Sequence, residues 1–300
     1  MIIVGDSLNK GLSESLGQKL DTKVIYPEII VFPDSEQRVR IPTKISGEKV
    51  YLLKSISSPV DSAVLQLSFI VDALNKNGAD KVIGIIPYIP YMRADHMFRT
   101  GEAVPLEIII NMVQDSGLSE IMMVDPHSIK IPEMFKIKVH SLSALSMFAQ
   151  KIKNIESAKD NITIVSPDMG GIRRLKLVDE LLGGVNQVVI NKDRNYESGE
   201  VRVAEYEGNI RGKCFIVDDI ISTGKTINQA IDTLDQNGAH AVYVFATHPV
   251  FSGSASELLS NSKAKKIFVT DSIPVPPKKR FGKLEILSIA DLIAKEIKSS

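Results

Sequence analysis

The sequence has little cysteine, no net charge and no long apolar run, and each shortage excludes a class of protein. The one cysteine, Cys214, cannot form an intrachain disulfide, and its apolar surroundings predict a buried thiol rather than a reactive one. The 36 basic and 36 acidic residues cancel, so charge gives no argument for binding nucleic acid. No apolar run approaches the roughly 18 residues that a membrane-spanning helix needs. We therefore expect neither a nucleic-acid partner nor a membrane segment.

Composition and length are those of an ordinary globular protein. Hydrophobic residues make up 44% and charged residues 24% of the chain, far from the composition of disordered segments. A length of 300 residues predicts about two domains. The apolar stretch at residues 2–4 is too short for the core of a secretory signal peptide. We expect a soluble, cytoplasmic protein.

Short β-branched segments alternate with amphipathic ones along the whole chain. This alternation predicts an α/β protein whose sheets are mainly parallel and flanked by helices. We expect strands near residues 2–4, 23–26, 49–53, 82–87, 121–124, 162–166, 187–190, 214–218, 242–247 and 266–270, and a further strand from 284. We expect helices near residues 9–20, 61–77, 105–116, 143–153, 171–182, 224–237, 255–261 and 288–298.

Three short matches, separated by about 160 residues, indicate an internal duplication. The matching pairs are 48–56 (EKVYLLKSI) with 212–220 (GKCFIVDDI), 77–79 with 237–239 (both NGA), and 4–6 with 166–168. Because the three pairs occur in the same order, we expect two tandem duplicated α/β domains. The expected ranges are 1–144 and 145–300, with the C-terminal helix packing on the first domain.

The two halves differ at the end of the strand in the first matching pair. The second half has two adjacent carboxylates there, Asp218 and Asp219, where ligands bind in open α/β sheets. The turn 222–226 (STGKT) can wrap backbone N–H groups around a phosphate, with Gly224 allowing close approach and a helix N-terminus following. Carboxylates repel a bare phosphate and suit sugar hydroxyls. The segment therefore predicts a sugar-phosphate site, whereas the first half has Lys54 instead.

A P-loop and a simple helix cap are two other interpretations of this segment. Residues 224–226 (GKT) resemble the end of a P-loop, but the glycine that such a loop requires five residues earlier is Asp219. The simpler alternative is a strand that turns into a helix capped by Ser222 or Thr223. Paired carboxylates at a buried strand end are costly without a partner, which argues against that alternative.

Two segments of the first half suit a planar, anionic ligand. Phe32, followed by Asp34 and Glu36, can stack on a flat base and accept hydrogen bonds from it or from ribose hydroxyls. Arg93 lies among tyrosines after a predicted strand, where a cation and aromatic rings suit a nucleotide. Taken alone, the first segment is also compatible with a simple turn and the second with a proline-rich connector.

Further polar residues follow other predicted strands. His127 could bind a metal or a phosphate, although a lone histidine is more often only hydrogen-bonded. Asp168 could join it as a ligand of Mg²⁺, which takes few protein ligands, or could cap a helix. Lys192 and Arg194 open a polar stretch, so they could close over phosphates or form a solvated turn.

The segment around Asp218 and the 222–226 turn resembles the phosphoribosyl-diphosphate-binding loop of type I phosphoribosyltransferases and ribose-phosphate diphosphokinases. The order of all the segments above is similar to that of the ribose-phosphate diphosphokinase family over essentially the whole chain. This resemblance implies two phosphoribosyltransferase-like domains and transfer of the diphosphoryl group of MgATP to ribose 5-phosphate. It also implies a homo-oligomer in which the ATP site is shared between subunits.

The resemblance also implies a role for each site residue. ATP would be bound by Phe32, Asp34, Ser35, Glu36, Arg93, Ala94 and His127, and Mg²⁺ by His127 and Asp168. Ribose 5-phosphate would be bound by Arg194, Asp218, Asp219, Ser222, Thr223, Gly224, Lys225 and Thr226. Lys192 and Arg194 would be catalytic.

Three residues depart from the family pattern. Ser35 and Lys225 replace usual glycines, and Ala94 replaces a usual glutamine. Loss of one hydrogen bond at Ala94 would cost about 0.5–1.5 kcal/mol, which lowers affinity without abolishing a reaction. Lys225 could add a phosphate contact, or its Cβ could strain a turn that prefers positive φ. A phosphoribosyltransferase and a non-catalytic homologue therefore remain the alternatives.

Overall fold

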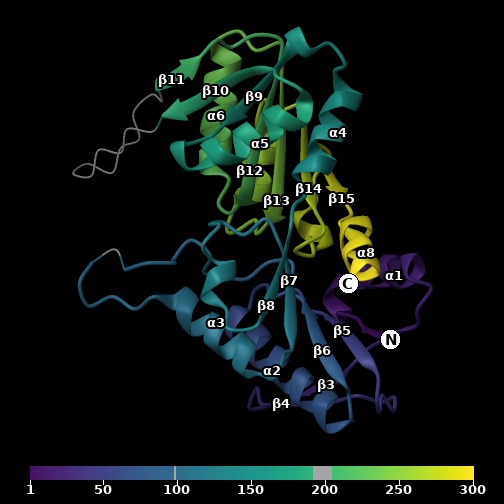
Figure 1. The fold of residues 1–300 in the computed structure, drawn as a ribbon. Coiled ribbons are helices and arrows are strands. Elements are labelled where there is room, and N and C mark those ends of the chain that lie inside the picture. The colour runs from purple at the N-terminus through teal and green to yellow at the C-terminus, as the bar shows by residue number, and fades with distance from the viewer. Residues whose placement is uncertain (98, 192–204) are drawn as a thin grey trace. The chain divides into compact units, whose positions relative to one another are not determined.

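The protein folds into two compact units, each with its own sheet and core (Figure 1). A computed structural model describes residues 1–97, 99–191 and 205–300. The N-terminal unit comprises residues 1–143, 271–274 and 288–300, and the C-terminal unit comprises 144–270 and 275–287. The last helix of the chain therefore belongs to the N-terminal unit.

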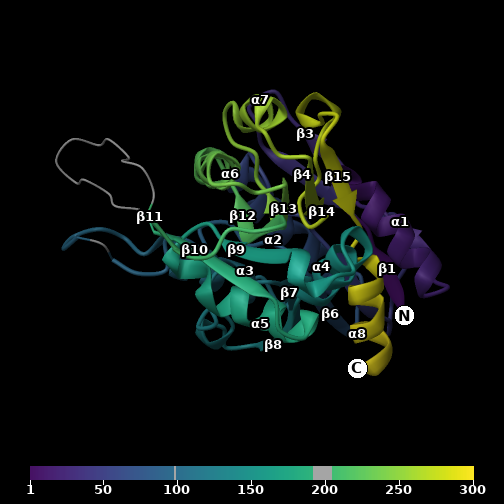
Figure 2. The same ribbon diagram turned by 90° about the horizontal axis from the view of Figure 1, so that it is seen from above.

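The N-terminal unit contains a six-stranded sheet in the order β2-β1-β5-β6-β7-β8, with every pair parallel. Its strands are β1 (Ile2–Val4), β2 (Val24–Ile25), β5 (Lys49–Leu53), β6 (Lys81–Ile85), β7 (Glu120–Val124) and β8 (Lys138–Leu142). Its helices are α1 (Lys10–Lys19), α2 (Val60–Lys76), α3 (Pro105–Asp115) and α8 (Ala290–Ser299). Side chains of α2 and α3 form one core with the sheet, and α8 lies beside α1 (Figures 1 and 2).

The C-terminal unit contains a seven-stranded sheet in the order β11-β10-β9-β12-β13-β14-β15, and only β11 is antiparallel. Its strands are β9 (Ile162–Ser166), β10 (Asn186–Asn191), β11 (Glu205–Gly208), β12 (Lys213–Ile221), β13 (Ala241–Pro249), β14 (Lys266–Thr270) and β15 (Leu284–Leu287). Its helices are α4 (Leu145–Ile155), α5 (Ile172–Leu182), α6 (Lys225–Gln236) and α7 (Ala255–Asn261). Figure 2 shows α6 and α7 on one face of this sheet and α4 and α5 on the other.

Single-turn 3₁₀ helices complete the described secondary structure. They are η1 (Ser7–Asn9) and η2 (Pro132–Met134) in the N-terminal unit, and η3 (Lys159–Asn161), η4 (Met169–Gly171) and η5 (Pro277–Lys279) in the C-terminal unit.

The two sheets share one strand order, which confirms the predicted duplication. The order β2-β1-β5-β6-β7-β8 corresponds strand by strand to β10-β9-β12-β13-β14-β15. In the first sheet Ile3 pairs with Tyr51, and in the second Ile164 pairs with Phe215. Asp6 and Asp168 occupy equivalent N-cap positions, of η1 and η4, in agreement with the match of 4–6 with 166–168.

Four strands were not predicted: β8, β11 and the hairpin of β3 (Glu28–Val31) and β4 (Gln37–Arg40). The hairpin strands pair only with each other, and most of their residues are exposed. Only Ile29 and Val39 of these strands pack on the core, so the alternation that identifies a half-buried strand is missing. The hairpin lies against α2 (Figure 1).

Two expectations drawn from composition can be compared with the described residues. Cys214 is fully buried in β12, as predicted, and burial raises the pKa of its thiol to about 12. Within residues 1–97, 99–191 and 205–300, no helix combines the length and apolarity required to span a bilayer.

A buried histidine joins the C-terminal helix to the edge of the N-terminal sheet. His140 of β8 contacts Glu296 of α8 through Nδ1 at 2.7 Å and Glu120 of β7 through Nε2 at 2.8 Å. Its side chain is only 6% exposed. The hydrogen bond from His140 holds the pKa of Glu120 below its usual range. The imidazole therefore crosslinks two carboxylates that come from distant parts of the chain.

We expect His140→Leu to lower the free energy of unfolding at pH 7 by about 1–3 kcal/mol, because two carboxylates lose a buried donor. A lowered pKa means that the contribution of Glu120 is present above its unfolded pKa of about 4.3 and is lost as the pH falls through the folded value. The difference in free energy of unfolding between wild type and variant should therefore shrink as the pH falls from about 6 to about 3. Urea unfolding at each pH measures it. An equal difference at both pH values would contradict this account.

Candidate functional site

The acid pair lies within β12, near the carboxyl edge of the C-terminal sheet. The strand was predicted to end near Asp218 with the acid pair at its carboxyl end, but pairing with β13 continues to Ile221, so both acids lie inside β12. The Asp218 side chain is 14% and the Asp219 side chain 5% exposed. Arg174 of α5 contacts both, with Nη1 donating to Asp218 Oδ1 at 3.0 Å and Nη2 lying 2.8 Å from Asp219 Oδ1. One guanidinium thus holds two carboxylates in place.

This environment changes the acidity of Asp218. Burial raises its pKa well above the usual range, and the neighbouring Asp219 and Asp168 raise it further, while Arg174 opposes the shift. Three carboxylates near one cation leave excess acceptor capacity at this edge. The site can therefore accept hydrogen bonds from a ligand rich in hydroxyl donors.

Arg174 was not among the residues predicted for the site. A signal was nevertheless present, because a buried acid pair requires a cation and α5 follows the strand next to β12. Ile172 opens α5, and the buried Leu175 and Val178 orient the helix toward the sheet. The sequence alone does not state which of Arg173 and Arg174 faces the acids. In the structure Arg173 is exposed and Arg174 is half-buried.

The turn after β12 has one residue that must be glycine. Gly224 has φ +75°, and a Cβ there would lie 3.2 Å from Leu259 Cγ. Lys225 is the first residue of α6 and is not among the described residues with positive φ. The strain considered for Lys225 from the sequence is therefore absent, and its exposed side chain is available at the helix N-terminus.

The N-terminus of α6 has no side-chain cap. The predicted alternative of a cap by Ser222 or Thr223 is wrong, because Ser222 Oγ instead contacts Ser252 Oγ at 2.9 Å. Thr223 is exposed and Thr226 is half-buried. The first backbone N–H groups of a helix have no partner inside it, so this end presents donors and positive potential to an anion. A helix end suited to an anion therefore follows the acid-bearing strand directly.

Asp168 occupies the N-cap position of η4 but forms no side-chain cap hydrogen bond. Its half-buried carboxylate is an oxygen donor of the type that Mg²⁺ prefers. Among the described residues, no group of three or more His, Cys, Asp or Glu side chains is arranged to hold a metal ion. Mg²⁺ usually needs only one or two protein ligands when substrate phosphates supply the rest. The residues therefore fit a cation that arrives with its phosphates.

The predicted catalytic cations Lys192 and Arg194 lie outside the described residues. The neighbouring residues Asn191 and Glu205 are partners in the antiparallel pair of β10 and β11. Asn191 ends β10, which lies beside β9 in the same sheet as the acid pair.

The predicted ATP-binding loop connects β3 and β4 in the N-terminal unit. Phe32 is 39% exposed, and the Arg38 guanidinium lies 5.7 Å from its ring centre. Asp34 accepts a hydrogen bond from the Glu36 N–H at 3.1 Å, and the Phe32 N–H donates to the Glu36 carbonyl at 2.8 Å. Ser35 has φ +72°, which explains why glycine suits this position. The turn presents an aromatic ring and two carboxylates at the surface.

The other predicted ATP residues lie beyond adjacent strands of the N-terminal sheet. Arg93 is exposed and Ala94 half-buried in the loop that joins β6 to α3, and this loop projects from the unit (Figure 1). His127 is exposed just beyond β7. The Val124 N–H donates to the Pro87 carbonyl at 3.1 Å, so the segments leading to Arg93 and His127 start side by side.

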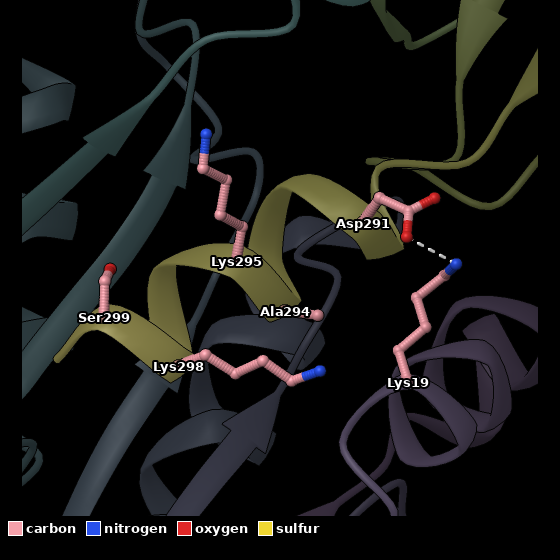
Figure 3. Close-up of a pocket in the computed structure, with 6 residues that line it drawn as sticks. All are labelled: Lys19, Asp291, Ala294, Lys295, Lys298 and Ser299. Carbon is pink, nitrogen blue, oxygen red and sulfur yellow. Dashed lines mark ion pairs between the residues drawn. The ribbon is translucent and has the colours of Figure 1, made fainter.

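A pocket of about 410 Å³ lies between α1 and α8, and none of its lining residues is a predicted site residue (Figure 3). It is lined by Lys19, Asp291, Ala294, Lys295, Lys298 and Ser299. Lys19 and Asp291 point toward each other and form an ion pair of 2.5 Å, whereas Lys295 points away from them. Lys295 and Lys298 are exposed and the half-buried Lys19 is already paired, so the pocket is part of the junction between α1 and α8.

Comparison with protein families gives two matches. Residues 1–117 match the N-terminal domain of ribose phosphate pyrophosphokinase, and residues 197–299 match the phosphoribosyl synthetase-associated domain. The two matched ranges lie at opposite ends of the chain.

Individual proteins match over nearly the whole length. Ribose-phosphate pyrophosphokinase from Aquifex aeolicus is 36% identical over 299 residues, which cover 99% of this chain and 94% of that protein. Ribose-phosphate pyrophosphokinase 1 from Streptococcus agalactiae is 33% identical, with 97% and 91% covered. The crystal structure of phosphoribosylpyrophosphate synthetase from Mycobacterium smegmatis superposes with a TM-score of 0.91 at 29% identity, covering 100% of this chain and 97% of the other.

Proposed function

The chain belongs to the ribose-phosphate pyrophosphokinase family, and from this premise we propose that it transfers the diphosphoryl group of MgATP to the 1-hydroxyl of ribose 5-phosphate. The products are 5-phosphoribosyl 1-diphosphate and AMP. The hydroxyl oxygen attacks the β-phosphorus in line, its proton is lost, and the bond from that phosphorus to the bridging α,β-oxygen breaks. The electron pair leaves with AMP. Such a reaction depends mainly on positioning and charge neutralisation.

Asp218 and Asp219 orient the ribose by accepting hydrogen bonds from its 2- and 3-hydroxyls. Arg174 supports this role, because its two contacts of 3.0 and 2.8 Å fix the carboxylates before a ligand arrives. An acceptor-rich edge can accept a hydrogen bond from both hydroxyls at once. This arrangement is the single observation that carries the assignment of the ribose site.

The 5-phosphate is bound by the turn 222–226 and the uncapped N-terminus of α6. Gly224 lets the backbone approach the phosphate, and the exposed Lys225 adds a cation at the first helical position. The acids and the phosphate site follow one another along the chain, so a single ligand can occupy both.

ATP is bound by the 32–36 loop, by Arg93 and Ala94, and by His127. Phe32 stacks on the adenine, while Asp34 and Glu36 accept its hydrogen bonds or those of its ribose. Asp168 of the C-terminal unit and His127 of the N-terminal unit would each be a ligand of Mg²⁺, which would neutralise charge on the phosphates of ATP when bound. Lys192 and Arg194 close over the phosphates and stabilise charge on the transferring group and on AMP.

Release of AMP from MgATP, with and without ribose 5-phosphate, tests this function. We expect AMP to depend on ribose 5-phosphate, with a new diphosphate at C1 seen by ³¹P NMR. A protein that binds both substrates but releases no AMP would instead be a non-catalytic homologue. A protein that consumes phosphoribosyl diphosphate with a base, and needs no ATP, would be a phosphoribosyltransferase.

We also propose that the chain works as a homo-oligomer with an ATP site shared between subunits. Exposed apolar side chains occur on neighbouring elements of the N-terminal unit: Val31 (62%) on β3, Leu65 (47%) and Phe69 (42%) on α2, and Ile108 (53%) on α3. Apolar patches of this kind mark association surfaces.

Phe69→Glu should lower the solution mass measured by size-exclusion chromatography with light scattering, because it places a charge in this apolar surface. It should also raise KM for ATP more than KM for ribose 5-phosphate. Leu177→Glu is the matched control, since Leu177 is similarly exposed (41%) but lies on α5 of the C-terminal unit. An unchanged mass for Phe69→Glu would place the subunit contact elsewhere.

A further inference from the structure

The N-terminal unit has a buried ion pair at the position that corresponds to the acid pair of the C-terminal unit. Lys54 follows β5 where Asp218 stands in β12, and it is only 2% exposed. Its Nζ lies 3.6 Å from Asp6 Oδ1, and Asp6 is itself 4% exposed. The second Asp6 oxygen accepts the Ser55 N–H at 2.8 Å. The protein's own ion pair therefore fills this edge of the first sheet.

A chain of amide side chains continues outward from this ion pair. Lys54 Nζ donates to Gln66 Oε1 at 2.7 Å, and Gln66 Nε2 donates to Gln37 Oε1 at 3.0 Å. Gln37 Nε2 then donates to Ser62 Oγ at 2.6 Å. An ammonium can only donate, so Gln66 must turn its oxygen toward Lys54 and its N–H groups toward Gln37. Gln37 in turn presents its oxygen to Gln66 and its N–H groups to Ser62.

The chain reaches the β3–β4 hairpin at Gln37, and the bond from Gln37 to Ser62 returns it to α2. Gln37 is the first residue of β4 and directly follows Glu36 of the proposed ATP-binding loop. The hairpin strands pair only with each other, and of their residues only Ile29 and Val39 pack on the core. Apolar contacts of this kind resist removal of the hairpin but fix its position along α2 poorly. The directional hydrogen bonds that join Gln37 to Gln66 and Ser62 of α2 fix the position of the hairpin along this helix.

We propose that Lys54, Gln66 and Gln37 are positioning residues that hold the 32–36 loop in place for ATP. The inference rests on the proposed function, because the loop must bind ATP for its position to matter. If the chain only satisfied the buried ammonium, Asp6 and Gln66 would suffice and Gln37 would not be required. The continuation to the hairpin is the feature that a purely local role does not explain.

Gln66→Met tests the proposal in the full-length protein, because it keeps the length of the side chain and removes both hydrogen bonds. We expect KM for ATP to rise roughly 3- to 10-fold, the effect of one lost hydrogen bond, while KM for ribose 5-phosphate stays within about twofold. Amide hydrogen exchange in residues 28–40 should become faster. Gln18→Met is the matched control, since Gln18 is exposed on α1 of the same unit.

Two more variants separate polarity from packing. Gln66→Glu still accepts from Lys54, and the Gln37 amide can rotate to donate to the new carboxylate, so this variant should behave nearly as wild type. Gln37→Met breaks the same link from the hairpin side, together with the bond to Ser62, and should raise KM for ATP at least as much as Gln66→Met. Agreement between Gln66→Met and Gln37→Met, with rescue in Gln66→Glu, supports a polar relay.

Phe32→Ala separates the failure of this inference from the failure of the proposed ATP site. A raised KM for ATP in Phe32→Ala, with unchanged KM and hydrogen exchange in Gln66→Met, would overturn the relay alone. An unchanged KM for ATP in Phe32→Ala would overturn the assignment of the loop to ATP, and the relay with it.

Discussion

Replacing Arg174 with methionine should weaken both the stability of the C-terminal unit and its affinity for ribose 5-phosphate. The variant leaves Asp218 and Asp219 side by side with exposed fractions of 14% and 5% and no guanidinium between them. Removing one partner from such a buried group costs about 3 kcal/mol of unfolding free energy. We expect KM for ribose 5-phosphate to rise about ten- to a hundredfold, which corresponds to a lost charge-assisted hydrogen bond. KM for ATP should stay within about twofold.

The pH dependence of the Arg174 variant distinguishes a functional role from simple destabilisation. Burial raises the pKa of Asp218, and Arg174 opposes that rise, so the variant should show a still higher value. The acid limb of kcat/KM for ribose 5-phosphate should therefore move to higher pH. When the pKa of a carboxyl is higher in the folded than in the unfolded state, the free energy of unfolding falls as the pH rises through the folded value. The loss of unfolding free energy should thus be larger at pH 8 than at pH 5.

Arg173→Met is the control for this experiment, because Arg173 is exposed on the same helix. It should leave stability, both KM values and the pH profile close to those of wild type. A normal acid limb in Arg174→Met, together with unchanged affinity for ribose 5-phosphate, would remove Arg174 from the ribose site.

Replacing Lys192 with alanine should lower kcat far more than it weakens binding of ribose 5-phosphate. If Lys192 stabilises charge that develops on the transferring group, its loss should lower kcat about 10²- to 10³-fold. The dissociation constant for ribose 5-phosphate, measured by calorimetry without ATP, should change less than about threefold, because that charge is absent in the ground state. An equal loss in both quantities would argue against a transition-state role.

Lys225→Ala provides the opposite pattern for comparison with Lys192→Ala. Lys225 is exposed at the first position of α6, beside the proposed phosphate site. A cation there binds the ground-state phosphate as strongly as the transition state, so its loss should raise KM with little change in kcat. The roles of the two lysines would then be distinguished by kinetics, because Lys192→Ala lowers kcat and Lys225→Ala raises KM.

Most of the architecture followed from local patterns. The duplication was visible because the segments 48–56 and 212–220 repeat a strand with its flanking residues, and both copies fold as central strands of equivalent sheets. Buried central strands are continuous apolar runs and are easily identified. The β3–β4 hairpin was missed because it is exposed on most of its residues, and β8 and β11 were missed at the edges of their sheets.

The functional segments divide in the same way. Asp218, Asp219 and the turn 222–226 are contiguous, so local sequence was enough to predict an acceptor-rich strand end followed by a helix N-terminus suited to an anion. The burial of Cys214 also followed from local sequence.

Only the tertiary structure decided which side chains neutralise the buried charges. Arg174 reaches the acid pair because α5 packs beside β9 and β12. Lys54 contacts Asp6, and is linked through Gln66 to Gln37, because β1, β5, α2 and the hairpin lie in one unit. These partners are separated by 12 to 48 residues in the chain, as in the pairs Lys54–Gln66 and Lys54–Asp6. A buried charge dictates that a partner must exist, but its identity depends on which strands and helices become neighbours.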